Sequence, residues 1–161
     1  MPGYQLRQGS DLDHAQLLKC MQCAYRELGA TALEHLADTV RQTLSDRTQL
    51  WWVESDNAES MPRVGFVRAT PHPIGCLWMG SAIEQATGQR QAYIFLVYVV
   101  PSHRRRGLGT ALMNHGQCWA KQHGYQQIGL QVFEHNQAAL TLYQKLGYQS
   151  QAIWMVKDLD R

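Results

Sequence analysis

Short apolar runs alternate along the chain with stretches in which apolar residues recur every three or four positions. Runs rich in β-branched and aromatic residues are typical of strands, because such side chains fit a pleated, half-buried surface. A spacing of three or four instead places one face of a helix against a core. The runs predict strands at 5–7, 50–54, 75–83, 91–100, 127–133 and 152–156, with 64–67 as a further short strand or an insertion.

The helical spacing predicts two helices near the N-terminus. Ser10 or Asp11 caps the first, because short oxygen-bearing side chains accept the free N–H groups of a first turn. The residues predicted on its inner face are Leu12, Ala15, Leu18 and Tyr25. The second helix covers roughly residues 32–44, with Thr31 as its cap and Glu34 at capping-box distance. Its inward residues are Leu33, Leu36, Val40 and Leu44.

Two further helices are predicted in the second half of the chain. One covers residues 108–122 and ends before Gly124, since glycine readily adopts the left-handed conformation that terminates a helix. Its predicted face consists of Leu108, Leu112, His115 and Trp119. The other begins after Asn136 and ends at Gly147. Its apolar residues are Ala139, Leu140, Tyr143 and Leu146.

The order of these elements predicts one α/β domain over residues 1–161. Strands 75–83 and 91–100 flank a turn at 86–89, so they are expected to form an antiparallel hairpin. The strand–helix–strand succession from 91 to 133 implies a parallel pair. The expected sheet is therefore mixed and mostly antiparallel, with about four flanking helices.

The connection between strand 91–100 and the helix at 108 has the composition of an anion site. Pro101 ends the strand, and three consecutive arginines (104–106) precede Gly107 and Gly109. A helix start presents unpartnered N–H groups and partial positive charge, and glycine lets a ligand approach the backbone. A phosphate or pyrophosphate is the expected guest. No lysine follows Gly109, which excludes a P-loop, and Leu112 stands where a dinucleotide fingerprint needs glycine or alanine.

Two motifs identify a family resemblance. Arg104, Gly107 and Gly109 form an Arg-x-x-Gly-x-Gly pattern that resembles the acyl-CoA pyrophosphate loop of the GNAT superfamily of N-acetyltransferases. Residues 136–148 resemble the second GNAT pattern, Asn-x-x-Ala-x-x-x-Tyr-x-x-x-Gly-[Phe/Tyr], at every marked position. With both motifs in the right order, the resemblance extends over nearly the whole chain.

The resemblance implies a GNAT-like sheet in which the two parallel strands separate at their C-terminal ends and hold acyl-CoA between them. Backbone groups of Tyr98 and Val99 are then expected to bind the acyl and pantetheine amides. The N–H groups of residues 104–110 are expected to surround the pyrophosphate. The implied cofactor-binding residues are Tyr98, Val99, Arg104, Arg105, Arg106, Gly107, Leu108, Gly109, Thr110, Asn136, Ala139 and Tyr143.

The same resemblance implies transfer of an acetyl group from acetyl-CoA to a primary amine, by direct attack in a ternary complex. Tyr143 is implied as the acid that protonates the leaving thiolate, since a phenol with a pKa near 10 suits a thiol with a pKa of about 8–9. Many relatives carry a glutamate base where this chain has Phe95. We assign Glu134 as the base, so that it and Tyr143 are the two catalytic residues. The alternatives for the base are Glu84 and an ordered water, and His103 and His115 are weaker candidates. A non-catalytic acyl-CoA-binding module is the alternative function.

Composition narrows the remaining partners. The formal net charge of +2 in 161 residues is too small for a general nucleic-acid binder. The chain has no apolar run of membrane-spanning length and no signal-peptide pattern, so we expect a soluble, cytoplasmic monomer or homodimer. The four cysteines lack zinc-site spacing, and we expect free thiols and no metal. Six aromatic residues either line the acceptor side or belong to the core: Tyr25, Trp51, Trp52, Trp78, Tyr93 and Phe95.

Overall fold

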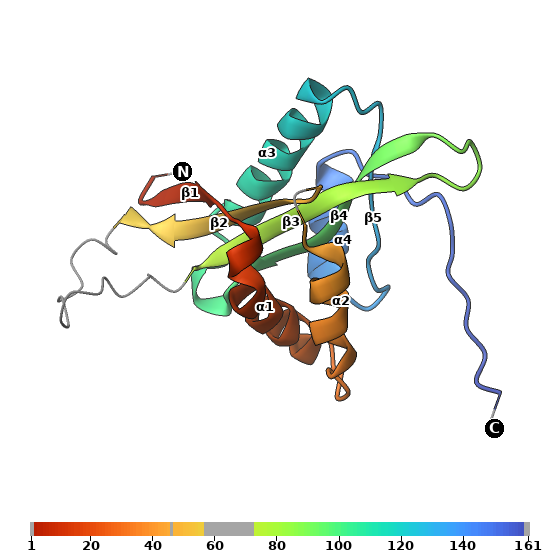
Figure 1. Cartoon of the computed structure of the whole chain (residues 1–161), viewed down its shortest axis with the longest axis horizontal. Coiled ribbons are helices and arrows are strands. Elements are labelled where there is room, and N and C mark those ends of the chain that lie inside the picture. Colours follow the sequence, from red (N-terminus) through yellow and green to blue (C-terminus); the bar gives the residue numbers. More distant parts are fainter. Residues whose placement is uncertain (1, 46, 57–72, 160–161) are drawn as a thin grey trace. The chain divides into compact units, whose positions relative to one another are not determined.

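The computed structural model describes residues 2–45, 47–56 and 73–159 (Figure 1). The short strand or insertion predicted at 64–67 lies outside these residues. The chain divides into two compact units, residues 1–131 and residues 132–161, and each is described by itself. The prediction of a single domain over 1–161 therefore stays a prediction.

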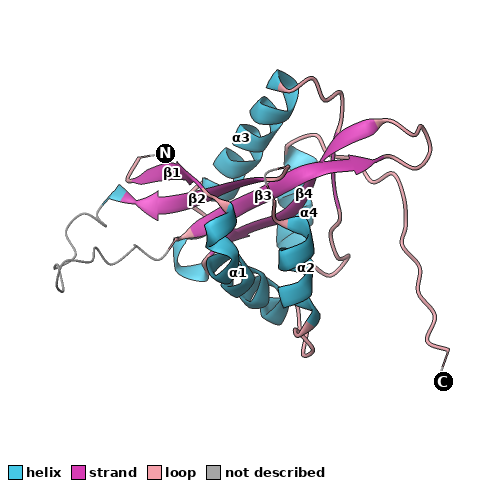
Figure 2. Cartoon of the chain, viewed as in Figure 1, coloured by secondary structure: helices cyan, strands magenta, loops and turns pink. Residues whose placement is uncertain are grey.

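The first unit is built on a five-stranded sheet with the strand order β1-β2-β3-β4-β5. Figure 2 shows β1, β2, β3 and β4 in magenta. The strands are β1 (Tyr4–Gln8), β2 (Gln49–Ser55), β3 (Gly75–Ile83), β4 (Arg90–Val99) and β5 (Ile128–Leu130). Neighbours from β1 to β4 are antiparallel, and β4 with β5 is parallel. The mixed sheet, its hairpin and its parallel pair confirm the predicted fold class, although β5 is shorter than the predicted strand 127–133.

Helices cover both faces of this sheet. Figure 1 shows α1 (His14–Glu27) and α2 (His35–Thr43) on one side and α3 (Leu108–Gln122) on the other. The α1/α2 side is closed by a cluster in which Leu17, Leu36 and Val40 pack against the fully buried Trp52 and Trp78. On the opposite side Gly116 of α3 faces Leu77 and Met79 of β3. Burial of large apolar side chains on both faces is the main force that holds β2 and β3 in the centre.

The inner face predicted for the first helix is partly wrong. Leu12 is 89% exposed, and Ala15 is exposed as well. Ser10 caps a separate 3-10 turn, Asp11–Asp13, whose capping box with Asp13 places the start of α1 at His14. Because a 3-10 turn has three residues per turn, the inward stripe is displaced. The buried residues of α1 are Leu17, Cys20 and Met21, with Leu18 and Tyr25 half-buried beside them.

The predicted cap of the second helix is also wrong, whereas its core residues are confirmed. Helix α2 begins at His35, and its N-cap residue is Glu34, which makes no side-chain cap hydrogen bond. Thr31 therefore lies outside the helix. All four predicted inward residues are buried: Leu33, Leu36, Val40 and Leu44. In α3 the buried residues are Leu108, Leu112, Met113, Gly116 and Ala120, so His115 and Trp119 lie at the margin of the inner face, half-buried.

The second unit contains α4 (Gln137–Lys145). The Asn136 side chain accepts a hydrogen bond from the Ala139 N–H (3.2 Å), which confirms the predicted cap. Gly147 ends the helical segment with φ +87°, and the Tyr148 N–H reaches the Tyr143 carbonyl (3.0 Å).

The strand predicted at 152–156 is wrong. Residues 149–157 have no regular secondary structure, and Ile153, Trp154, Met155 and Val156 are 79–87% exposed. Residues with high strand propensity stabilise a strand only when they pack and pair with a neighbouring strand. Among the described residues, no strand ladder includes this segment.

Candidate functional site

The site begins at a bulge in β4. Trp78 of β3 is opposite Leu96 and the next residue, Met79, is opposite Ile94, so Phe95 is the extra residue in the ladder. A bulge lets two successive side chains lie on one face of a strand. Accordingly, both Phe95 and Leu96 pack against the α1/α2 core cluster. Phe95 is held by aromatic neighbours: its ring centroid lies 4.9 Å from that of Trp78.

The ladder between β4 and β5 ends just before this bulge. Its register joins Ala92 with Ile128, Tyr93 with Gly129 and Ile94 with Leu130. Strand β4 continues to Val99, five residues beyond the last pair, with β3 as its partner on the other side. A strand edge that extends past its neighbour presents backbone N–H and C=O groups. Tyr98 and Val99 are at this end of β4, as predicted.

The connection to α3 presents a helix start with free donors. After the 3-10 turn Pro101–His103, Arg105 and Gly107 adopt left-handed backbone conformations with φ of +62° and +79°. Gly107 is the N-cap residue, and the first helical hydrogen bond runs from the Ala111 N–H to the Gly107 carbonyl (2.9 Å). The N–H groups of residues 108–110 therefore precede the first intrahelical bond and face outward. The first turn of α3 contains no acidic residue.

Two of the three arginines are engaged by the protein itself. Arg104 donates from Nε to the Val99 carbonyl (2.7 Å) and from Nη2 to Glu27 (2.6 Å), and its own N–H bonds Pro101 (3.2 Å). The Arg104 N–H is thus already used, which reduces the predicted row of free N–H groups to residues 105–110.

Arg106 is held on the opposite side of the loop. It donates to the Tyr4 hydroxyl (2.8 Å) and to the Ser102 carbonyl (3.3 Å), and that hydroxyl also lies 3.0 Å from Nδ1 of His103. His103 is therefore part of a packed contact with β1 rather than a free residue facing solvent. Tyr4 could not be identified from the sequence, because its partners lie about a hundred positions away in the chain.

Glu27 is a second residue that sequence reasoning missed. It is the last residue of α1, and its carboxylate accepts hydrogen bonds from the Tyr98 hydroxyl (2.8 Å) and from Arg104. Burial raises the pKa of Tyr98, and the neighbouring Glu27 carboxylate raises it further, so the phenol stays protonated and donates. The Arg104 guanidinium also lies over the Tyr98 ring, 5.6 Å from its centroid.

The candidate bases differ sharply in their surroundings. Glu84 accepts three hydrogen bonds in the β3–β4 turn, from the Ala86 N–H and from the N–H and hydroxyl of Thr87, and these lower its pKa. A carboxylate with a lowered pKa is a weaker base, and all three of these donors belong to the turn itself. His115 is half-buried against Trp51, with ring centroids 4.7 Å apart, and burial lowers its pKa. Glu134 is an exposed residue of the second unit.

Tyr143 is the buried residue of α4, with 9% of its surface exposed. Burial raises the pKa of Tyr143 to about 12, and the neighbouring Tyr148 contributes to the increase. The two rings lie 5.8 Å apart. The phenol is consequently in its protonated, proton-donating form throughout the neutral range.

The aromatic residues divide between core and surface. Trp52 and Trp78 are fully buried and Trp51 is 7% exposed, which favours the core interpretation for all three. Tyr93 and Phe95 are half-buried neighbours on β4, with ring centroids 5.4 Å apart. Burial raises the pKa of Tyr93, and Tyr25 adds to the shift.

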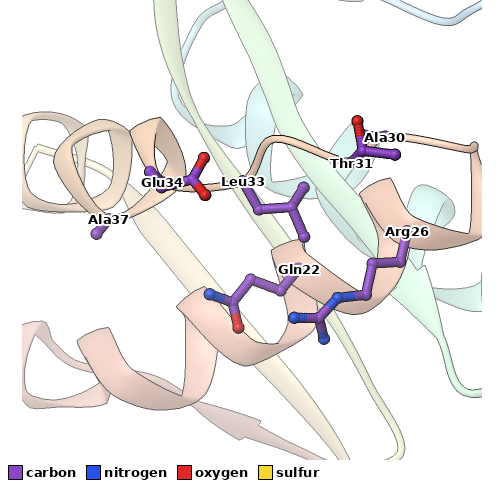
Figure 3. Close-up of a pocket in the computed structure, with 7 residues that line it drawn as sticks. All are labelled: Gln22, Arg26, Ala30, Thr31, Leu33, Glu34 and Ala37. Carbon is purple, nitrogen blue, oxygen red and sulfur yellow. The ribbon is translucent and has the colours of Figure 1, made fainter.

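Two of the hollows on the first unit lie away from the end of β4 and from the loop at 100–107. Figure 3 shows one of about 510 Å³ with Gln22 and Arg26 on α1 and Leu33 and Glu34 across from them; Ala30, Thr31 and Ala37 complete its lining. Another, of about 430 Å³, is lined by residues of β1, β2 and α3 and by His123, which follows α3. Neither lining includes a residue of β4 or of the loop at 100–107. The end of β4 and the loop therefore lie outside both of these hollows.

Within residues 2–45, 47–56 and 73–159, no group of three or more His, Cys, Asp and Glu side chains is placed to hold a metal ion. The cysteines are free: Cys20 and Cys76 are buried, and Cys23 and Cys118 are exposed. None of the helices described here combines the length and apolar character that a membrane crossing requires.

Comparison with known proteins agrees with the two motifs. The family model described as "Acetyltransferase (GNAT) family" matches residues 27–148. Rat N-acetyltransferase 8F1 is 29% identical over 126 residues, which are 78% of this chain and 51% of that protein. The uncharacterized N-acetyltransferase YdgE of Bacillus subtilis is 28% identical over 115 residues, 71% of this chain and 64% of that one. The chain spans about half the length of the rat relatives that it matches.

Solved structures agree on the fold. A putative acetyltransferase from Pyrococcus furiosus superposes with a TM-score of 0.72 at 19% identity, covering 97% of this chain and 99% of that one. A predicted acetyltransferase from Clostridium acetobutylicum, solved with acetyl-CoA, has a TM-score of 0.72 at 17% identity, over 97% and 96% of the two chains. The family model confirms the predicted GNAT resemblance. The chain belongs to the acetyltransferase (GNAT) family.

Proposed function

We propose that this chain is an N-acetyltransferase that transfers the acetyl group of acetyl-CoA to a primary amine of a small molecule, peptide or protein. The observation that carries the proposal is the succession of an extended β4 end, a loop with two left-handed residues and a helix start with outward N–H groups. Such a surface binds an extended amide-bearing arm that ends in a pyrophosphate. We propose acetyl-CoA as the acyl donor because the chain belongs to the acetyltransferase (GNAT) family.

The donor site is proposed to use backbone groups more than side chains. Tyr98 and Val99 bind the pantetheine amides along β4, and the N–H groups of residues 105–110 bind the pyrophosphate. The Val99 carbonyl already accepts from Arg104 but has a second lone pair for an amide of the donor. Arg105, which is exposed, supplies positive charge next to the phosphates. Asn136, whose carbonyl oxygen caps α4, keeps its amide N–H groups to donate, and Ala139 provides a small neighbour.

The chemistry follows from positioning the amine next to the thioester. The amine nitrogen attacks the thioester carbonyl carbon; a C–N bond forms, the C–S bond breaks, and the amine loses a proton. Tyr143 gives its proton to the departing thiolate; its raised pKa keeps the phenol protonated at neutral pH and also makes it a weaker acid than an ordinary tyrosine. Glu134 accepts the proton of the amine. The lowered pKa of Glu84 weighs against the alternative base.

A non-catalytic acyl-CoA-binding module is the second candidate function. It is favoured by Phe95, which fills the bulge between Trp78 and Tyr93 with an aromatic ring in place of a carboxylate. The two functions share the donor site and differ only in the transfer step. An assay of CoA release from acetyl-CoA with a panel of primary amines distinguishes the two functions. Turnover with any amine supports the enzyme. Binding of acetyl-CoA without turnover of any amine supports the non-catalytic module.

Donor binding itself is tested by calorimetric titration with acetyl-CoA and with the 3′-dephospho donor. The variant Gly107→Glu places a carboxylate at the helix start, and Gly124→Glu is its matched control at the other end of α3. Both glycines have φ +79° and no atom within 4 Å of an added Cβ, so the two variants carry the same backbone strain. We expect binding by the wild type and by Gly124→Glu, and loss of binding by Gly107→Glu. Equal binding by the two variants would remove the proposed phosphate site.

A further inference from the structure

The loop that follows β4 is tied to helix α1 by three side chains. Arg104 reaches the Val99 carbonyl with Nε and the Glu27 carboxylate with Nη2, at 2.7 and 2.6 Å. The other carboxylate oxygen of Glu27 accepts from the Tyr98 hydroxyl at 2.8 Å. One carboxylate therefore joins the end of α1, the end of β4 and the start of the loop. We call this set the Glu27–Tyr98–Arg104 link.

The contacts of the Arg104 side chain with Val99, Glu27 and Tyr98 fix its position in the link. A guanidinium donates in a rigid planar fork, so its two bonds to Val99 and Glu27 fix its plane and its direction. Its position over the Tyr98 ring adds a third contact. The Arg104 and Glu27 side chains are 42% and 35% exposed, so the pair lies at the surface beside the loop rather than deep in the core. An arginine held in this way has its Nε and Nη2 directed at the protein, and its plane is set by the link rather than by a ligand.

We propose that Glu27 is a positioning residue for the donor site, which acts through Arg104 to set the angle between the end of β4 and the loop that begins α3. This inference rests on the proposed function and deepens it. The first arginine of the Arg-x-x-Gly-x-Gly pattern then serves as an internal strut, and the phosphate is recognised by the backbone N–H groups that this strut orients. Arg105 remains as the side chain that adds charge for the ligand.

The link is expected to affect the binding of donors that contain phosphate and not of donors that lack it. The part of the donor next to the loop is the pyrophosphate, whereas the thioester end lies along β4, where the β3 ladder fixes the backbone. Loosening the link therefore weakens phosphate binding and leaves the alignment of the thioester nearly unchanged. A general loss of structure would instead reduce activity with every donor alike.

The test compares Glu27→Gln with the wild type on two donors, acetyl-CoA and acetyl-pantetheine, which has no phosphate. Glutamine keeps the size of the side chain and can still accept from Tyr98, but it loses the charge that holds Arg104. We expect the Kd and KM for acetyl-CoA to rise about tenfold, with kcat within twofold, since a charge-assisted hydrogen bond at a partly exposed site has about this effect. With acetyl-pantetheine, kcat/KM is expected to change less than twofold, because the β3 ladder still holds the backbone of Tyr98 and Val99. Asp38→Asn, which breaks an exposed ion pair with Arg41 on α2, is the matched control.

A double-mutant cycle distinguishes a structural role of Arg104 from direct binding of phosphate by its side chain. If Arg104 acts through Glu27, the variants Glu27→Gln, Arg104→Gln and the double variant bind acetyl-CoA with similar Kd values. If Arg104 instead binds phosphate and Glu27 only competes for it, Glu27→Gln binds acetyl-CoA as tightly as the wild type or more tightly, which would overturn the inference. An equal loss with both donors would also overturn it. A wild type that binds no CoA would defeat the proposed function, a result that the wild-type titration shows by itself.

Discussion

Gly107 and Gly124 hold the same left-handed backbone conformation, with φ +79°, at opposite ends of α3. At neither position would an added Cβ meet another atom within 4 Å. Backbone conformation alone, and not space, therefore requires glycine at both positions. Gly107 starts the helix at the proposed phosphate site, whereas Gly124 follows its C-terminal end.

This pairing predicts that Gly107→Ala and Gly124→Ala lower the free energy of unfolding by a similar amount, about 1 kcal/mol each, because both force an L residue into the left-handed region. Only Gly107→Ala is expected to weaken acetyl-CoA binding, since it alone changes the helix start. Urea unfolding and calorimetry on the same preparations measure the two effects. Matched losses of both stability and binding would show that strain in α3, and not the loop, governs the donor site.

The sheet was predictable because each of its central strands contains a continuous apolar run. Residues 75–80 are all buried, so β3 is visible in the sequence as a continuous apolar run without alternation. The start of α3 was equally predictable, because Pro101 ends the preceding strand and Gly107 comes directly before a helical pattern of apolar residues. By contrast, the inner face of α1 was wrong at Leu12 and Ala15 because a capped 3-10 turn, which the pattern does not reveal, displaces the helix by part of a turn.

Features that depend on distant partners could not be predicted. Residues 152–156 have the composition of a strand, but a strand exists only with a neighbour, and pairing is a long-range property. Glu27 and Arg104 are 77 positions apart, and neither residue carries a local signal of the other. The same holds for Tyr4 and Arg106, 102 positions apart. The sequence thus indicates that the loop binds an anion, while the side chains that hold the loop emerge only from the fold.

Replacement of Tyr143 by phenylalanine is expected to lower kcat about 100-fold and to leave the Kd for acetyl-CoA nearly unchanged, because only the proton donor is removed. Since the pKa of Tyr143 is about 12, its deprotonation does not reduce turnover below about pH 10. Steady-state rates from pH 6 to 10 and a calorimetric Kd measure both. Unchanged turnover in Tyr143→Phe would exclude the assigned role.

The raised pKa of Tyr143 also predicts a dependence of stability on pH. Between about pH 10 and 12 the unfolded phenol loses its proton while the folded one keeps it, so the folded state binds more protons and stability falls as pH rises. The contribution of this residue is fully present below its unfolded pKa of about 10 and amounts to about 2 kcal/mol lost by pH 12. Unfolding by urea at pH 9 to 12 should show a shallower decline for Tyr143→Phe than for the wild type. Parallel curves would mean that burial does not protect this phenol.

The two acidic candidates for the base make opposite predictions. Glu134→Gln is expected to lower kcat with a primary amine about 100-fold at pH 7, because the attacking amine then has no carboxylate to accept its proton. Glu84→Gln is expected to keep wild-type turnover, since the Glu84 carboxylate is occupied by three donors of its own turn and its pKa is lowered. Rates of CoA release at saturating acetyl-CoA compare the two variants directly. Full activity in Glu134→Gln would leave an ordered water as the proton acceptor, and loss of activity in Glu84→Gln alone would place the acceptor amine beside the β3–β4 turn.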